Sequence, residues 1–444
     1  MKFSAGDLKR VEDLVFSFFC QSSDFNGIGL RRISKELNID YVHSIDLIKQ
    51  LVIDGTVSIQ SSTNPNIIGF RHHAKELQQD VLENAKHIKE SKTLIGSFKL
   101  VSEQTEYPIC VYPSKEYLKM HRDVTDFGYA KYKVALALAE PQLSFRFFET
   151  DVLERYSGEP RFDFQFQDFS GSISCKYDEV GNAAMREEDQ IFLKSFGLGF
   201  DAAANRVIAV LLCDLSKLSF EHQVFWSTKE IPPENCKVLK DYYDNIIEGD
   251  WIAARSVFSA LIEELNAIYA LTQSIFGISI FSKELQKEEP ARNFTFFFSP
   301  TSKNYYEFIN LLDKYLSENI NRSFFEGKIT LEELTPLDDS TFERKQKGTL
   351  RLLEEWITSD FNYSDKTIPA QIMAPLKKVR RERQTPAHKV YENIYDVAFI
   401  GRQKEIMESC YLSIRSIRRN LQTHPLAKNV DLGSDLDEDN VKYF

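Results

Sequence analysis

The hydrophobic period changes twice along this 444-residue chain, and these changes limit what it can fold into. Apolar residues recur at helical spacing in the first seventy residues, follow short strand patterns from about residue 93 to 240, and return to helical spacing after Pro233. The length corresponds to about three domains of ~150 residues each. We therefore expect a multidomain α+β fold, in which a central mixed α/β region rich in strands lies between two helical regions.

The order of patterns in residues 1–75 is that of a three-helix domain followed by a hairpin. Helical spacing covers Leu8 to Phe19, a short second helix covers Leu30–Leu37, and a third helix runs from Val42 to a stop at Gly55. Residues 56–68 then predict a small hairpin, the wing. This order resembles winged helix-turn-helix domains, and we assign residues 1–75 to such a domain.

The expected third helix carries few of the side chains that read DNA. A DNA-reading helix offers mainly Arg, Lys, Asn or Gln to bases and phosphates. Here the polar positions are Tyr41, His43, Ser44, Asp46, Lys49 and Gln50. Residues 7–71 hold eight acidic and seven basic side chains, so the balance favours a module that binds a protein over a DNA reader. Both interpretations stay open.

Residues 93–240 predict a strand-rich domain, which we regard as a candidate sensor. Strands are expected at Phe162–Phe166, Ser170–Cys175 and Arg206–Cys213, and a helix at Tyr132–Ala139. The region contains no P-loop, no Gly-rich fingerprint and no metal-ligand spacing. Asp163 and Asp168 lie at the solvent side of a strand and at a turn, which makes a paired-carboxylate site a poor interpretation.

The remaining residues predict a helical connector over 241–300, a helical bundle over 301–428 and an acidic tail over 429–444. In the connector, Phe294–Phe298 is expected to be a short strand. Long helices with short connections favour an antiparallel bundle. Its helices are expected at residues 302–319, 340–359, 372–384, 387–400 and 403–422.

Charge is distributed unevenly along the chain. The net charge is −11, yet residues 366–428 hold 13 Lys and Arg against 5 Asp and Glu, a net +8. The tail carries −4, which leaves −15 for residues 1–365. A cationic segment inside an acidic chain fits local binding of a polyanion. It fits equally well a basic helix face that is neutralised by the acidic remainder of the chain.

Two of the eight histidines follow an arginine by five residues inside this basic segment, at Arg383…His388 and Arg419…His424. This R-x4-H spacing in a helical bundle resembles the HEPN superfamily, over roughly residues 302–428 and most closely over 375–425. The resemblance implies a metal-independent endoribonuclease, a homodimer with two motifs meeting across a two-fold axis, and no cofactor. It also implies attack of an RNA 2′-hydroxyl on its own 3′-phosphate, leaving 2′,3′-cyclic phosphate and 5′-hydroxyl ends.

The first copy of the motif is the favoured catalytic site. Thr385 and Pro386 suit the N-cap and first position of a new helix, so a helix break is expected between Arg383 and His388. On the resemblance, His388 transfers the proton and Arg383 stabilises charge on phosphorus. The residues expected to support the site are Gln384, Asn393 and Asp396, and those expected to hold phosphates are Lys377, Lys378, Arg380, Arg381 and Lys389.

The second copy, Arg419, Asn420 and His424, is the second choice. Arg419 and His424 are expected at the end of one long helix, where five residues of unbroken helix separate two side chains by about 140°. His424 is expected to donate hydrogen bonds to free carbonyls at the helix end.

Several classes of protein are disfavoured by composition. The longest apolar run, Val207 to Cys213, is too short to cross a membrane, and charges at Asp7 and Lys9 precede any signal-like segment. The six cysteines are dispersed, which favours reduced thiols, a cytoplasmic location and no metal. The expected partners are RNA, a second copy of the chain and a protein trigger bound through the N-terminal domain.

By analogy with similar architectures, the protein is expected to be a regulated toxin or antiphage effector. The acidic tail would then mask the basic site until a trigger arrives. Two alternatives remain: a DNA-binding regulator whose bundle dimerises, and a noncatalytic interaction protein.

Overall fold

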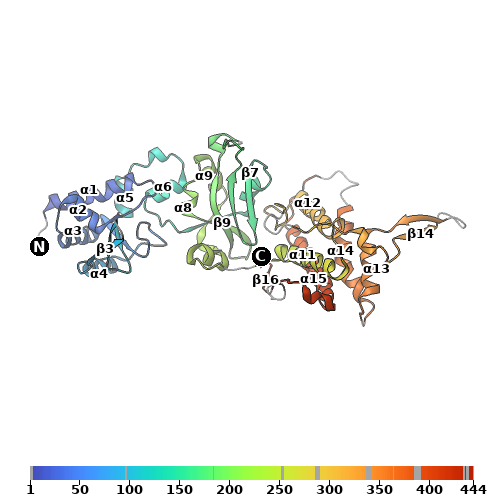
Figure 1. Cartoon of the computed structure of the whole chain (residues 1–444). Helices are drawn as coiled ribbons and strands as arrows, with labels where there is room; N and C mark the ends of the chain where they lie inside the picture. Colours follow the sequence, from blue (N-terminus) through green and yellow to red (C-terminus); the bar gives the residue numbers. More distant parts are fainter. Residues whose placement is uncertain are drawn as a thin grey trace. The chain divides into compact units, whose positions relative to one another are not determined.

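A computed structural model of the chain describes residues 4–95, 98–183, 185–251, 255–285, 291–336, 342–363, 365–384, 392–433, 436 and 440–443. The fold is mixed α+β, with several sheets and a group of helices in the C-terminal half (Figure 1). It forms two compact units. Unit 1 contains residues 1–149 and 173–238, and unit 2 contains residues 150–172 and 239–444.

Unit 1 begins with the three helices expected from the sequence: α1 (Ala5–Gln21), α2 (Leu30–Leu37) and α3 (Tyr41–Asp54). Their apolar stripes share one core with the strands described next, because residues three and four apart lie on the same face of a helix. The Asp40 side chain caps α3 by accepting a hydrogen bond from the amide of His43. Gly55 ends α3 with φ of 77°, a left-handed conformation that favours glycine.

The predicted hairpin over residues 56–68 is wrong. β2 (Val57–Ser61) pairs instead with β5 (Ile109–Pro113), with Ile59 opposite Val111, and β1 (Ile28–Gly29) pairs with the other side of β5. Residues 62–66, Ser-Thr-Asn-Pro-Asn, form turns and offer no apolar alternation, whereas every residue of β5 is buried. Residues between β2 and β5 include α4 (Lys75–Ala85) and a hairpin of β3 (Glu90–Ile95) and β4 (Phe98–Glu103).

The central strands form one sheet in the order β11-β6-β10-β9-β8-β7, with β12 also paired to β9. The strands are β6 (Phe145–Phe148), β7 (Phe162–Gln167), β8 (Ser170–Cys175), β9 (Phe192–Phe200), β10 (Arg206–Leu211), β11 (Glu230–Ile231) and β12 (Lys237–Val238). The helices over this part of the chain are α5 (Lys115–His121), α6 (Lys131–Ala137), α7 (Glu154–Ser157), α8 (Leu212–Leu215) and α9 (Phe220–Ser227).

The strands predicted at β7, β8 and β10 and the helix at α6 are therefore confirmed. β10 is buried along nearly its whole length, as a continuous apolar run indicates. Strand β10 ends at Leu211, sooner than predicted, because Leu212 and Cys213 belong to α8.

Unit 2 is built mainly from helices around one hydrophobic core. They are α10 (Lys240–Tyr243), α11 (Val257–Phe276), α12 (Ser302–Asp313), α13 (Thr349–Asp360), α14 (Ile368–Gln384) and α15 (Ala398–Gln422), with π-helical turns at Asp244–Glu248 and Lys314–Glu318. Besides β7 and the start of β8, unit 2 contains β13 (Arg255–Ser256), which pairs with β16 (Val441–Lys442), and the hairpin of β14 (Glu332–Pro336) and β15 (Phe342–Gln346).

Three predictions in this region are wrong in part. Phe294–Phe298 forms no strand, because its consecutive rings are buried in edge-to-face aromatic contacts instead of alternating across a ladder. Residues 342–346 are strand β15, and the helix predicted over 340–359 begins only at Thr349. Residues 392–397 are not helical, and α15 begins at Ala398, while 387–391 lie outside the described residues.

Candidate functional site

The candidate site lies at the C-terminal end of α14, the most basic helix of the bundle. Its buried stripe, which includes Ile372, Leu376 and Val379, packs into the core of unit 2. Because the buried residues recur with the 3.6-residue period of the helix, they occupy one face, and the basic side chains lie on the remaining surface. Arg383 lies in the last turn and Gln384 is the exposed final residue.

Arg383 is held in place by two carboxylates. Its Nη1 lies 2.5 Å from Oδ2 of Asp313 and also donates to Glu318, while Arg380 Nη1 lies 2.6 Å from the same Asp313 oxygen. Asp313 is fully buried and accepts a further hydrogen bond from Ser317 at 2.6 Å. The pKa of Arg383 is raised above its usual value because Asp313, and then Glu318, accept its hydrogen bonds.

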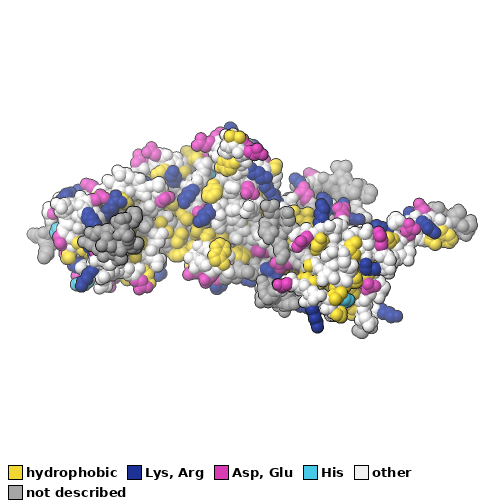
Figure 2. All heavy atoms as spheres, viewed as in Figure 1, with side chains coloured by type: hydrophobic (Ala, Val, Ile, Leu, Met, Phe, Trp, Pro, Cys, Tyr) yellow, Lys and Arg dark blue, Asp and Glu magenta, His cyan; other side chains and the backbone are white. Residues whose placement is uncertain are grey.

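The other described members of the expected phosphate-binding set also have protein partners. Lys377 Nζ lies 2.6 Å from Glu354 on α13, and Lys378 Nζ lies 2.7 Å from Glu405 on α15. Arg381 Nε donates to the carbonyl of Lys377 at 3.3 Å. On the face drawn in Figure 2, basic and acidic side chains are interspersed over the C-terminal helices. Four of the five basic side chains of α14 (Lys377, Lys378, Arg380 and Arg383) are thus paired with acids from other elements of unit 2.

His388, Lys389, Thr385 and Pro386 lie outside the described residues. The first R-x4-H copy is therefore described only on its arginine side.

Asn393 and Asp396 act as caps of two helices. Oδ1 of Asn393 accepts hydrogen bonds from the Lys303 amide at 3.0 Å and from the Ser302 hydroxyl at 3.3 Å, in the first turn of α12. Oδ1 of Asp396 accepts from the Ala398 amide at 2.9 Å, where α15 begins. Both roles satisfy helix amides that would otherwise lack a partner.

The second motif copy lies where α15 ends, and its histidine is bound differently from the prediction. His424 Nδ1 accepts a hydrogen bond from the Leu426 amide at 3.2 Å and caps the short 3₁₀ helix Pro425–Asn429. The sequence predicts that His424 donates to free carbonyls at the end of α15. Its capping contact is instead with the following 3₁₀ helix, which Pro425 starts directly after His424. Asn420 Nδ2 donates to the Ser416 carbonyl at 2.8 Å, and Arg419 is exposed.

Sequence reasoning missed Asp313 and Tyr305. Tyr305 donates a hydrogen bond to Glu382 on α14, and its pKa is raised, mainly by burial and then by this carboxylate. One signal was available for Asp313: it follows Ile309 and Leu312 on the apolar stripe of its helix, where an acid needs a buried partner.

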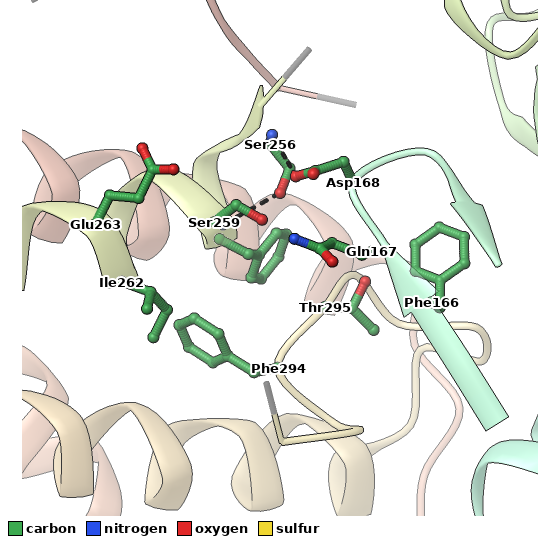
Figure 3. A pocket seen from close by; sticks show the side chains of 10 residues that line it. Phe166, Gln167, Asp168, Ser256, Ser259, Ile262, Glu263, Phe294 and Thr295 are labelled. Atoms are coloured by element: carbon green, nitrogen blue, oxygen red, sulfur yellow. Dashed lines mark hydrogen bonds between the residues drawn. The ribbon is translucent and has the colours of Figure 1, made fainter. Parts of the chain in front are cut away.

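Asp168 lines a small cavity at the start of α11, where its carboxylate contacts the backbone (Figure 3). Its Oδ1 accepts a hydrogen bond from the Ser256 amide at 2.8 Å, and Ser256 in turn caps α11. Asp163 instead accepts from Gln165 at 3.5 Å. The two acids therefore have separate partners.

In unit 1, α4 packs against the expected recognition helix α3. Lys49 Nζ lies 2.9 Å from Glu83, and Asp46 lies 2.6 Å from Lys86 Nζ. Two of the polar side chains predicted to face DNA or a partner, Asp46 and Lys49, are thus paired with α4 and the residue that follows it, whereas Gln50 donates to Asp54 of α3 itself.

The described residues of the acidic tail contact other parts of unit 2. Lys442 pairs with Asp241, Asn440 accepts from Arg255 at 2.8 Å, and the Leu436 carbonyl accepts from Arg418 at 3.4 Å.

Comparisons with protein-family models, with curated proteins and with solved structures find no match to this chain. Within the described ranges, no group of three or more His, Cys, Asp or Glu side chains is arranged to hold a metal ion. No helix formed by described residues is long and apolar enough to span a membrane.

Proposed function

We propose that the C-terminal helices form a metal-independent endoribonuclease of the HEPN type, acting as a regulated toxin or antiphage effector. The observation that carries this proposal is the position of Arg383 in the last described turn of α14, where Asp313 and Glu318 hold its guanidinium. Residues 392–397 are not helical and α15 begins only at Ala398, while the helix break expected between Arg383 and His388 lies outside the described residues. Such a break would allow the two side chains to converge, whereas a continuous helix separates them.

The anchoring of Arg383 supports its assignment as the charge-stabilising group. A preorganised donor stabilises a transition state more effectively than a freely rotating one. Asp313 and Glu318 both bind Nη1, and a guanidinium carries five N–H donors in all. In the proposed reaction, His388 removes the proton from the 2′-hydroxyl as the oxygen attacks phosphorus, and the 5′-oxygen leaves and takes up a proton.

RNA would bind by exchanging carboxylates for phosphates on α14. Lys377 and Lys378 keep about 40% of their side-chain surface exposed despite their ion pairs. Exposed pairs contribute about 0–1 kcal/mol, so phosphates can compete with them. Arg380 is 38% exposed, and it would keep its contact with the buried Asp313 while its other N–H groups bind phosphate. Arg381 and Lys389 complete the proposed phosphate-binding set, and a second copy of the chain would complete the active dimer.

The decisive comparison uses wild-type, His388→Ala and His424→Ala proteins with total RNA and tRNA in EDTA. We expect the wild type and His424→Ala to leave 2′,3′-cyclic phosphate and 5′-hydroxyl ends, and His388→Ala to lose cleavage by about 100-fold or more. Expression of the wild type and of His424→Ala should be toxic, and expression of His388→Ala should not. Equal cleavage by wild type and His388→Ala would remove the first copy as the site, and absence of both cleavage and toxicity in the wild type would refute the proposal.

The ion pairing of α14 favours a noncatalytic helical scaffold as the second candidate. In that case His388→Ala would change neither RNA cleavage nor toxicity. A winged-helix DNA regulator is less well supported, because Asp46 and Lys49 of α3 pair with α4.

A further inference from the structure

Unit 1 contains a cleft of about 550 Å³ that shares no residue with the proposed ribonuclease site. Its walls come from the loop after α1, the loop after β2, helix α6, the segment at Gln142 and the turn after α8. The volume lies within the ~300–1,000 Å³ range of small-molecule binding sites. The cleft is therefore large enough for a ligand of metabolite size.

Backbone hydrogen bonds hold the walls of the cleft together. The Gly27 amide donates to the Asn66 carbonyl at 3.2 Å, and the Gln142 amide donates to the Ile68 carbonyl at 2.7 Å. The Gln142 side chain, which is 7% exposed, donates from Nε2 to the Asp24 carbonyl at 2.9 Å. Because three separate segments are joined in this way, the cleft is formed before any ligand arrives.

Two lysines that line the cleft, Lys133 and Lys217, form no ion pair with any residue in the described ranges. Lys131, only two residues from Lys133, pairs with Glu230 at 2.7 Å and does not line the cleft. Lys217 lowers the pKa of Asp214 electrostatically, but burial outweighs this effect and raises that pKa. The charged residues that line the cleft are Lys133, Lys217 and Asp24, so the lining has a net positive charge although the whole chain is acidic.

The rest of the lining combines amides with an apolar wall. Asn26, Asn64 and Asn66 provide donors and acceptors, while Ile67 and Leu136 provide apolar surface. Such a mixture suits a ligand that has a flat ring with polar edges as well as an anionic group.

Phe25 lines the same cleft with a strained backbone. Its φ is 55°, which is uncommon for a bulky residue and costs roughly 1–3 kcal/mol. Its ring is held by Phe19 at 5.8 Å and Phe127 at 6.3 Å between centroids. Strain that is retained by surrounding contacts is found most often at ligand sites.

We propose that this cleft binds a nucleotide, with the phosphate on Lys133 and Lys217 and the base between the amides and the apolar wall. The proposal stands independently of the ribonuclease activity. The lysines supply the charge-assisted hydrogen bonds that phosphate requires, and the amides can read the edge of a base.

The test is calorimetric titration of the full-length chain with AMP, GMP, CMP, UMP, ATP and GTP, and separately with inorganic phosphate and adenosine. The variants are Lys133→Gln and Lys217→Gln, with Lys131→Gln as the matched control on the same helix. We expect at least one nucleotide to bind with Kd below 1 mM. Each cleft variant should bind about tenfold or more weakly, whereas Lys131→Gln should bind like the wild type.

Three results would overturn the proposal. The first is no binding by any nucleotide of the panel, and the second is binding that Lys133→Gln and Lys217→Gln leave unchanged. The third is phosphate binding as tightly as the nucleotides, which would make the cleft a simple anion site. Thermal unfolding of each variant establishes that it is folded, and both cleft lysines are exposed, so their replacement is not expected to unfold the chain.

Discussion

At the scale of single residues, Asp313 is the acid on which the end of α14 depends. It is fully buried and accepts hydrogen bonds from both Arg380 and Arg383. Removing one partner of a buried charge pair leaves the other partners unsatisfied. We expect Asp313→Asn to lower the free energy of unfolding by about 2 kcal/mol in urea titrations.

Glu318→Gln provides the control for this variant. Glu318 contacts the same Arg383 atom but is 41% exposed, so its loss should cost less than about 1 kcal/mol. Equal effects of the two variants would show that burial of Asp313 does not determine its contribution.

The cysteines differ in burial, and this predicts an order of thiol reactivity. Burial raises the pKa of Cys410 and of Cys110 to about 12, while Cys20 and Cys236 are half-buried and their pKa values are raised less. Since the thiolate is the reactive form, Cys236 and Cys20 should be alkylated first at pH 8 and Cys410 last. Mass spectrometry of iodoacetamide-treated protein measures the order, and early labelling of Cys410 would contradict its burial.

The same shifts fix the sign of a pH effect. A thiol with a raised folded-state pKa stays protonated in the native chain, while in the unfolded chain it ionises near its usual pKa of ~8.5. The stability that Cys110 and Cys410 contribute is therefore fully present below about pH 8.5 and is lost as the pH rises toward about 12.

At the scale of elements, Gly55 ends α3 in a conformation that other residues avoid. Its φ is 77°, and a side chain there is strained even though the space around it is open apart from Lys75. Gly55→Ala should lower the free energy of unfolding by roughly 1–2 kcal/mol. Gly401 lies within α15 with nothing within 4 Å of an added Cβ, so Gly401→Ala should not lower the free energy of unfolding and serves as the control.

Elements with strong local signals could be predicted from the sequence, and those set by distant partners could not. α2 and β8 lie where their periodicity and flanking residues put them. The partner of β2 is β5, almost fifty residues later, and no local pattern specifies that pairing. In the candidate site, the basic face of α14 was evident from composition, but the partners of Arg383 come from α12 and the turn after it.

For the chain taken as a whole, the segment 150–172 belongs with residues 239–444 in unit 2, although residues 173–238 of unit 1 separate the two in the sequence. Its contacts within unit 2 are polar and aromatic: Glu154 with Asn304, Phe162 with Arg292, Phe164 with Phe298, and Asp168 with Ser256. A strand pattern such as that of β7 shows which face is apolar, but it does not show which core will bury that face.

A fragment of residues 239–444 should therefore fold less stably than the same residues in the full chain. Loss of Phe164 leaves the ring of Phe298 without one of its partners, and loss of Asp168 leaves the Ser256 amide without its acceptor. We expect the fragment to bind a hydrophobic dye and to unfold at lower urea concentration than this region does in the intact protein. A peptide of residues 150–172 should reverse both effects, whereas a scrambled peptide should not. Unfolding of the fragment alone at the same urea concentration as the intact protein would show that unit 2 does not depend on this segment.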